Sequence, residues 1–107
     1  MTSSHPWTVL KVVGEVDLSR LTELEDLVAS NCNGHCPDAV IDLTEVTFMD
    51  STGLGWLLRS RDLFHDAGQR FSIVIPPSLD RLFDVSGLRS AFETHRSLEE
   101  AKAGNSL

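Results

Sequence analysis

Basic residues are scarce in this sequence, and they are scattered singly along it. Nine Lys and Arg stand against sixteen Asp and Glu, which gives a formal net charge of −7. A protein that binds nucleic acid needs a basic patch to displace the counterions of the phosphates, so we expect no DNA or RNA partner. The same charge balance argues against binding to an anionic membrane surface.

Long apolar runs are also missing. No run approaches the roughly 20 residues that span a bilayer. The N-terminal MTSSHPW lacks the basic and apolar regions of a signal peptide, so we expect a cytoplasmic protein. An apolar share of 41% in 107 residues is typical of a soluble domain with one core, and we take residues 1–107 as a single domain.

Cysteine occurs only at positions 32 and 36, in the turn-rich segment NCNGHCPD with His35 between the two. This spacing suggests a zinc site, but structural zinc takes four ligands and the sequence offers no second ligand pair. We expect reduced thiols in a solvated loop, with no metal and no cofactor.

Hydrophobic periodicity predicts strands that alternate with helices. Residues 7–16 are rich in β-branched side chains and predict a strand. Asp17 is a candidate N-cap for an amphipathic helix over 18–30. The apolar face of that helix is formed by Leu18, Leu21, Leu24 and Val28.

The rest of the chain continues this alternation. The segment 39–43 predicts a short buried strand, and 45–49 leads into the next helix. Further strands are expected at 71–75 and, at the sheet edge, 91–95. Further helices are expected at 51–67 before Gly68, at 78–87 with Ser78 as cap and Gly87 at the end, and from Ser97 with Glu100 in a capping box. The order predicts an α/β domain whose helices pack on a mixed or parallel sheet.

The stretch FMDSTGLG at 48–55 combines an acid, two hydroxyl side chains and two glycines, and it is the strongest candidate for a functional site in the sequence. A serine-hydrolase elbow needs a glycine where Met49 stands, and no motif places a histidine as its base. A P-loop needs a Gly-Lys pair that the sequence lacks. A phospho-aspartate site at Asp50 needs a second acid and a lysine that we do not find. An enzyme is therefore disfavoured, and the simplest role left is capping of the following helix by Asp50 or Ser51.

A third interpretation makes the motif a site of modification. A hydroxyl at the exposed start of a helix is accessible to a kinase, and the helix dipole favours the added phosphate. Phosphorylation would then act on whatever docks there rather than on the fold.

A helix wheel of this segment separates two faces. The core-facing arc holds Leu54, Leu57, Leu58 and Phe64. Trp56 and Leu63 lie on the opposite side. They are either ordinary exposed residues, residues covered by a neighbouring helix or, for Trp56, part of a partner interface.

Three segments, in order, carry a resemblance to one family. VIDLTEVTFMDSTGLGWLL (40–58), GEVD (14–17) and PPSLDRLFDVSGL (76–88) resemble the signature segments of the STAS domain, the anti-sigma factor antagonist family of bacteria. The resemblance covers 7–107. It implies a single STAS-like α/β domain with a mixed sheet of about four strands and four to five helices.

The resemblance also implies a regulatory switch rather than an enzyme. In this family the unmodified antagonist binds an anti-sigma factor, which is a serine kinase of the histidine-kinase-like ATPase class, and so frees the sigma factor. The kinase phosphorylates the serine after the motif aspartate and thereby releases the antagonist. A serine phosphatase resets the cycle.

Carried onto this sequence, the resemblance makes Ser51 the phosphoacceptor and Thr52 the second candidate. Glu15 and Asp17 correspond to family acids at the partner surface, and with Asp50 they would form an acidic patch around the hydroxyl. The partner-binding residues expected from the motif, the helix wheel and the resemblance are Glu15, Asp17, Asp50, Ser51, Thr52, Gly53, Leu54, Trp56, Ser86, Gly87 and Leu88.

The sequence also departs from the family. Only MTSSHP precedes Trp7, so the extra first strand that members often have is short or missing here, and NCNGHCPD is not a feature that we associate with the family. Members without kinase partners exist, as scaffold subunits of stress complexes and as lipid-transport components. The alternative function is therefore a STAS scaffold or adaptor without phospho-turnover. The acceptor serine favours the switch.

Overall fold

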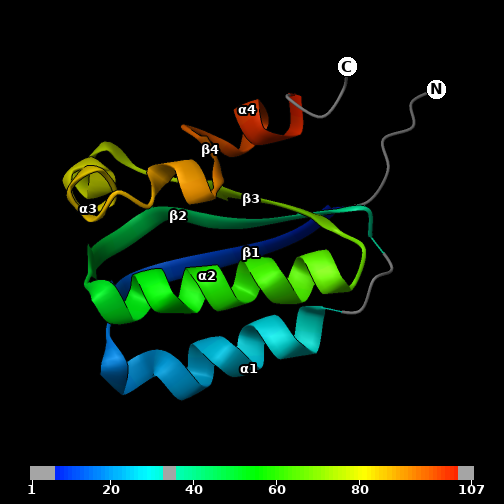
Figure 1. Ribbon diagram of the computed structural model, residues 1–107, viewed down its shortest axis with the longest axis horizontal. Coiled ribbons are helices and arrows are strands. Elements are labelled where there is room, and N and C mark those ends of the chain that lie inside the picture. The colour runs from blue at the N-terminus through cyan, green and yellow to red at the C-terminus, as the bar shows by residue number, and fades with distance from the viewer. Residues whose placement is uncertain (1–6, 33–35, 104–107) are drawn as a thin grey trace.

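The computed structural model describes residues 7–32 and 36–103, which form one sheet and the helices that cover it (Figure 1). The sheet has four strands in the order β1-β2-β3-β4, and each neighbouring pair is parallel. The strands are β1 (Trp7–Val16), β2 (Asp38–Met49), β3 (Arg70–Val74) and β4 (Glu93–His95). The helices are α1 (Leu21–Asn31), α2 (Ser51–Asp66), α3 (Asp80–Ser86) and α4 (Leu98–Ala103). The α/β class and the four strands are confirmed, and the sheet is parallel rather than mixed.

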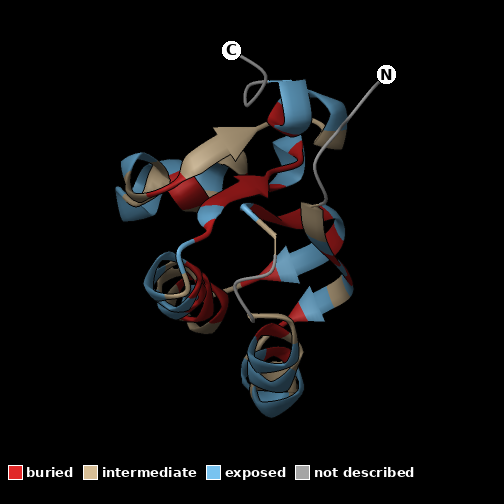
Figure 2. Ribbon diagram, turned by 90° about the vertical axis from the view of Figure 1, so that its right-hand side faces the viewer, coloured by how far each residue is buried: buried red, intermediate tan, exposed pale blue. Residues whose placement is uncertain are grey.

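Apolar side chains hold both faces of the central strands. Helices α1 and α2 pack on one face (Figures 1 and 2), where the main core includes Trp56 and Phe64. Helix α4 closes a smaller cluster of Val40, Val74 and Ala101 with β2 and β3. Strands covered on both faces read as continuous apolar runs, which is why 39–43 and 71–75 lack a clear alternation.

Strand β2 runs unbroken where the sequence suggested a short strand and a separate lead-in. Its register against β1 shifts between Lys11 and Val13. The Asp42 carboxylate accepts hydrogen bonds from the backbone N–H of Thr44 (3.0 Å) and from the Thr44 hydroxyl (2.8 Å). This local turn accommodates one extra residue of β2 as a β-bulge, and the strand does not end there. Strand β2 therefore continues to Met49, and the motif that begins at Asp50 lies at the carboxyl end of the strand.

The first helix begins later than expected. Residues Leu18–Arg20 form a 3₁₀ turn with Asp17 as its N-cap, and α1 begins at Leu21. The tighter turn places Leu18 out of phase with the apolar face of α1, so Leu18 is 70% exposed rather than part of the core.

The third helix shows a second difference. A 3₁₀ turn at Pro77–Leu79 precedes α3, and Leu79 rather than Ser78 occupies the N-cap position of the helix. Pro77 suits the first position of that turn because its missing N–H would have no partner there. The predicted helix end is confirmed, since Gly87 adopts a φ of +74° as the C-cap.

Candidate functional site

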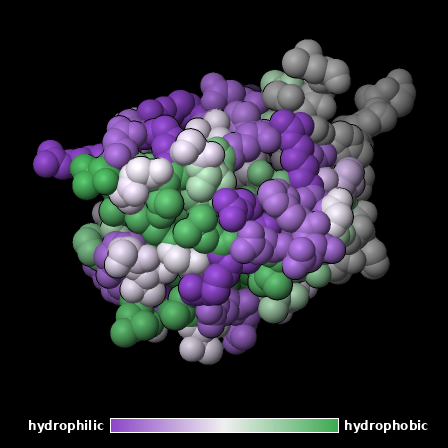
Figure 3. Space-filling model, in the orientation of Figure 1, coloured by the Kyte–Doolittle hydropathy of each residue, from purple (hydrophilic) through white to green (hydrophobic). Residues whose placement is uncertain are grey.

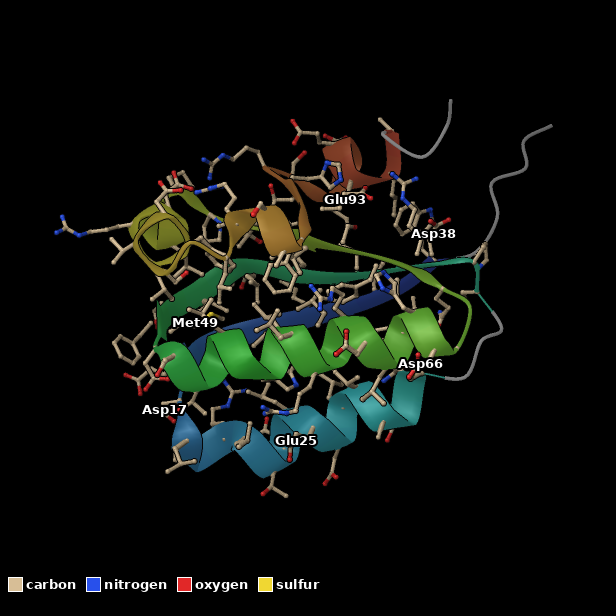
Figure 4. The ribbon with its side chains drawn as sticks, viewed as in Figure 1. Asp17, Glu25, Asp38, Met49, Asp66 and Glu93 are labelled. Carbon is tan, nitrogen blue, oxygen red and sulfur yellow. The ribbon has the colours of Figure 1, made fainter. Side chains whose placement is uncertain are left out.

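The carboxyl ends of β1 and β2 bring the two acidic motifs together. In the register, Glu15 lies opposite Phe48 and Val16 opposite Met49. The Asp50 N–H donates to the Val16 carbonyl at 3.4 Å. Figure 4 shows Asp17 and Met49 at the same end of the molecule. Parallel strands expose their carboxyl ends at one edge, which is where sites form in such sheets.

Asp50 is the cap of α2. Its Oδ1 accepts from the Thr52 N–H at 2.9 Å, while its carbonyl oxygen accepts from the N–H groups of Gly53 (3.0 Å) and Leu54 (3.3 Å). One residue thus satisfies three donors of the first turn. Capping therefore does not require the hydroxyl of Ser51.

The Ser51 side chain is exposed at the first position of α2. Across residues 7–32 and 36–103 its hydroxyl makes no hydrogen bond, and no histidine or other base is paired with it. Thr52, the second candidate, is half-buried. The arrangement offers an accessible hydroxyl without the activating base that a nucleophile needs, so it can receive a group more readily than attack one.

Gly53 holds the start of α2 close against the strands. A Cβ at this position would lie 2.6 Å from the Met49 Cγ and 2.8 Å from the Val16 Cγ1. Any side chain would therefore push the helix start away from the sheet, which explains a glycine inside a helix on packing grounds. Gly53 itself is buried.

The three acids expected to surround the hydroxyl, Glu15, Asp17 and Asp50, differ in their hydrogen bonds. Asp17 is half-buried, and its Oδ1 accepts from the N–H (3.1 Å) and hydroxyl (2.6 Å) of Ser19. Asp50 is committed to the cap of α2. Glu15 is exposed, its backbone carbonyl accepts from Arg20 at 2.7 Å, and among the described residues its carboxylate has no hydrogen-bond or ion-pair partner. The carboxylate of Glu15 is thus the acid that remains available to a partner.

Apolar side chains that sequence reasoning missed border the same edge. Leu18 follows Asp17 and is 70% exposed, and Phe48, opposite Glu15, is 49% exposed. Figure 3 shows hydrophobic surface gathered toward the end where α2 begins. Strand alternation was the available signal for Phe48, because it sends this ring to the face opposite the buried Met49.

The turn Ser86-Gly87-Leu88 lies at the same end of the molecule as the start of α2 (Figure 1). The Ser86 hydroxyl donates to the Phe83 carbonyl (3.1 Å) and accepts from the Leu88 N–H (3.3 Å). Next to it, Val85 is 77% exposed. Within the described residues no hydrogen bond joins this turn to Asp50 or Ser51, so the expectation that it borders the partner surface stays a prediction.

Besides Gly53, two more residues expected to face a partner are buried instead. Leu54 is 4% exposed and Trp56 is 1% exposed. Trp56 is covered by α1, whose residues line a pocket together with it. The expectation that Leu54 and Trp56 contact a partner is therefore wrong, because α2 is buried on two faces, one by the sheet and one by α1.

The cysteine segment has a structural explanation. The Cys32 thiol donates to the Leu63 carbonyl (3.1 Å), and burial raises its pKa, which makes the thiolate less accessible. His35 lies outside the described residues. Among residues 7–32 and 36–103 no three His, Cys, Asp or Glu side chains are grouped to hold a metal. No helix of this part of the chain is long and apolar enough to cross a membrane.

Comparison with known proteins adds family information to this geometry. Residues 2–94 match the family model described as "Mlab, STAS domain". The anti-sigma-B factor antagonist of Staphylococcus epidermidis is 29% identical over 91 residues, which cover 84% of each chain. The solved anti-sigma factor antagonist from Mycobacterium paratuberculosis superposes with a TM-score of 0.83 at 26% identity, over 96% of this chain and 88% of that one. The phosphorylated Bacillus cell fate determinant SpoIIAA shares the fold, with a TM-score of 0.66 at 21% identity over 97% and 95% of the two chains.

Proposed function

The chain belongs to the STAS-domain family, and on that premise we propose that it is an anti-sigma factor antagonist controlled by phosphorylation of Ser51. The unphosphorylated form binds an anti-sigma factor serine kinase of the histidine-kinase-like ATPase class and frees its sigma factor. The printed names of the Staphylococcus and Mycobacterium relatives support the antagonist role. In this proposal the chain works in the cytoplasm as a kinase substrate and binding module, not as an enzyme, and a serine phosphatase resets it.

The observation that supports the proposal most directly is that Asp50 caps α2, while the hydroxyl of Ser51 takes no part in the cap. Asp50 accepts the hydrogen bonds of the free N–H groups in the first turn of α2. The neighbouring Ser51 hydroxyl is exposed and makes no hydrogen bond within the described residues. A kinase can therefore transfer the γ-phosphoryl group of ATP to the Ser51 oxygen without breaking a structural contact. The new O–P bond replaces the bond to ADP, and the hydroxyl proton leaves to a base of the kinase.

The surroundings of Ser51 explain how phosphate would release a partner. We define the switch surface as Glu15, Leu18, Phe48 and Ser51. Its exposed apolar side chains supply contact area, and Glu15 supplies a negative charge that suits a basic partner surface. A phosphate would add about −1.5 to −2 charges beside Asp50 and Glu15, and would occupy the space that the partner needs. The positive end of the α2 dipole would meanwhile keep the fold stable.

Phosphorylation is tested by capture and labelling. The tagged chain is expressed in its native host, the ATP-dependent kinase that copurifies with it is isolated, and transfer from radiolabelled ATP is followed. We expect label on the wild type and on Thr52→Ala, and none on Ser51→Ala. Label that persists on Ser51→Ala would contradict Ser51 as acceptor.

Docking is tested separately, by titrating the same kinase with unphosphorylated variants. We expect Phe48→Ala to weaken binding by about tenfold or more, as for a buried aromatic anchor. Ser51→Asp should weaken it as well. Val9→Ala is the matched control, because Val9 is also an exposed apolar residue of the sheet but lies at the other end of β1. Equal weakening by Val9→Ala and Phe48→Ala would place the docking surface elsewhere.

A STAS scaffold without phospho-turnover remains the alternative, and one mass measurement separates the two. Intact protein from the native host should carry a partly populated species about 80 Da heavier, the mass of one phosphoryl group. A single unmodified species in growing and in stressed cells would favour the scaffold.

A further inference from the structure

The side chain of Arg20 covers the edge of the sheet beside Glu15. Strand β1 is an edge strand, because the strand order is β1-β2-β3-β4. An edge strand leaves backbone groups on its outer side without a strand partner. The Nη1 of Arg20 donates to two such groups, the carbonyl oxygens of Val13 and Glu15, both at 2.7 Å. Arg20 therefore covers the edge of β1 where that strand reaches the switch surface.

The two hydrogen bonds require a bend in β1. Two oxygens that both lie 2.7 Å from one nitrogen can be no more than twice that distance apart. In a regular strand, carbonyl oxygens two residues apart are separated by two residues of rise, about 6.6 Å. Gly14, between them, has a φ of +87°, and the register against β2 shifts directly after it. Arg20 thus holds the bend of the chain at Gly14.

Helix α1 and the turn before it fix the position of this guanidinium. The Arg20 Nε and Nη2 donate to the two carboxylate oxygens of Glu23, at 3.4 and 3.1 Å. Arg20 is the last residue of the 3₁₀ turn that Asp17 caps, and its N–H donates to the Asp17 carbonyl at 3.1 Å. A planar guanidinium makes such contacts together because its donors point in fixed directions. One side chain therefore links β1, the turn and α1.

These contacts act on the backbone of Glu15 and leave its carboxylate free. The backbone sets the direction of the Cα–Cβ bond, and the carboxylate is exposed, without a partner among the described residues. A partner that binds a loose segment must order it, and that ordering reduces the affinity. Because Arg20 orders the segment beforehand, the partner would not bear this cost.

We propose that Arg20 is a positioning residue of the switch surface: it holds the bend at Gly14 and so presents the Glu15 carboxylate to a basic partner. The inference rests on the proposed function, because the partner is the anti-sigma factor kinase of that proposal. Charge alone predicts the opposite effect of losing Arg20. Removal of a positive charge near Glu15 would strengthen the attraction to a basic surface, whereas loss of positioning weakens binding.

Paired glycine variants test the bend. Gly14→Ala and Gly68→Ala each place a side chain at a positive φ, of +87° and +81°, so both should lower the melting temperature. Gly68 follows the end of α2, whereas the switch surface lies at its start. In titrations with the copurified kinase, well below the unfolding temperature, Gly14→Ala should bind about fivefold or more weakly. Gly68→Ala should bind as the wild type does, and equal affinities of the two variants would overturn the role of the bend.

A double-mutant cycle tests whether Arg20 acts through Glu15. Arg20→Ala should weaken kinase binding about fivefold, and Arg20→Lys, which keeps a donor for the two carbonyls, should recover part of the loss. In the Glu15→Gln background, Arg20→Ala should have little further effect, because the carboxylate that it positions is gone. Arg59→Ala is the control for lost charge and should bind as the wild type does, since Arg59 also pairs with a glutamate of α1, Glu25 at 3.3 Å. Additive losses in the cycle would overturn the positioning role.

Relaxation measurements on the free ¹⁵N-labelled protein separate this inference from the proposed function. The backbone N–H order parameters of Gly14 and Glu15 should be those of rigid backbone in the wild type and in Arg59→Ala, and lower in Arg20→Ala. Absence of kinase binding to the wild type would overturn the proposed function and this inference together. Kinase binding by the wild type with unchanged order parameters in Arg20→Ala would overturn this inference alone.

Discussion

Two helix starts in this molecule contain a serine and an acid, and they use them in different ways. At the start of α4, Ser97 is the cap, and its Oγ accepts from the Glu100 N–H at 3.0 Å. Glu100 closes the turn by accepting from the Arg96 N–H at 2.7 Å. At the start of α2, Asp50 takes the capping role and Ser51 stands one position inside the helix.

The difference shows how a serine becomes available for modification. The hydroxyl oxygen of a serine at the N-cap accepts a hydrogen bond from a backbone N–H of the first turn. A group added to that oxygen would break this bond. A serine one position later keeps the favourable dipole but carries no structural bond. Ser97 is therefore structural, and Ser51 is free for chemistry performed by another protein.

A substitution at the closely packed start of α2 should have the largest effect on the stability of the protein. Gly53→Ala should destabilise the protein by about 1–3 kcal/mol, because the new Cβ would overlap Met49 and Val16. Its control is Gly55→Ala in the same helix. A Cβ there would meet only the flexible end of Arg59 at 3.3 Å, so higher helix propensity should stabilise by up to about 1 kcal/mol. Urea unfolding measures both, and effects of equal sign would contradict the close approach.

Loss of the α2 cap should be the next largest effect. Asp50→Ala removes the acceptor of the Thr52 N–H and should cost about 1 kcal/mol. Asp50→Asn keeps a capping oxygen and should restore most of this stability, which separates capping from charge. Thermal unfolding of the two variants provides the measurement. Equal losses in both would mean that the charge of Asp50, not its cap, stabilises the helix.

Local periodicity predicted most of this architecture. The strand expected at 7–16 has those bounds in the structure, and Leu57 and Phe64 are fully buried on the predicted face of α2. Asp17 caps the turn that follows β1, as its residue type and position indicated. These features depend on neighbours within a few positions along the chain, which is why one sequence sufficed to find them.

The errors arose where distant elements decide the environment. A helix wheel gives α2 one buried face, but α1 covers a second one, and Trp56 is buried there. Leu18 has helical spacing to the core residues, yet the 3₁₀ turn moves it to the surface. Alternation along β2 indicated an exposed Phe48 ring, but its position opposite Glu15 depends on the register between β1 and β2, which no local pattern specifies.

Replacing either of the two serines should change the stability of the protein by less than loss of the Asp50 cap, and Ser97 should matter more than Ser51. Ser97→Ala removes the Oγ that accepts from Glu100 and should cost about 0.5–1 kcal/mol. Ser51→Ala should change stability by no more than about 0.5 kcal/mol, because its hydroxyl makes no structural bond in the described part of the chain. Chemical denaturation, with hydrogen exchange of α4 as a local readout, compares them. A larger loss for Ser51→Ala would reverse the assignment of roles.

The smallest expected effect on stability comes from Glu93 in β4, the strand that leads into α4. Burial opposes ionisation of Glu93, but hydrogen bonds from His95 (2.9 Å) and Arg70 (2.8 Å) outweigh it and hold the Glu93 pKa below its ordinary value of 4.5. A lowered pKa in the folded state stabilises the protein above the unfolded pKa, and this stabilisation is lost as pH falls through the folded pKa.

Glu93→Gln should therefore cost about 0.2–1 kcal/mol near neutral pH, the range of partly exposed ion pairs. The difference from wild type should shrink as the pH falls below about 4.5, where the unfolded carboxylate takes up its proton. Urea unfolding at several pH values measures this slope. Glu99→Gln, on the exposed side of α4, is the control, because it removes one acid without touching the contacts of Glu93. A constant difference across the acid range would mean that packing, rather than the charge of Glu93, holds β4 against β3.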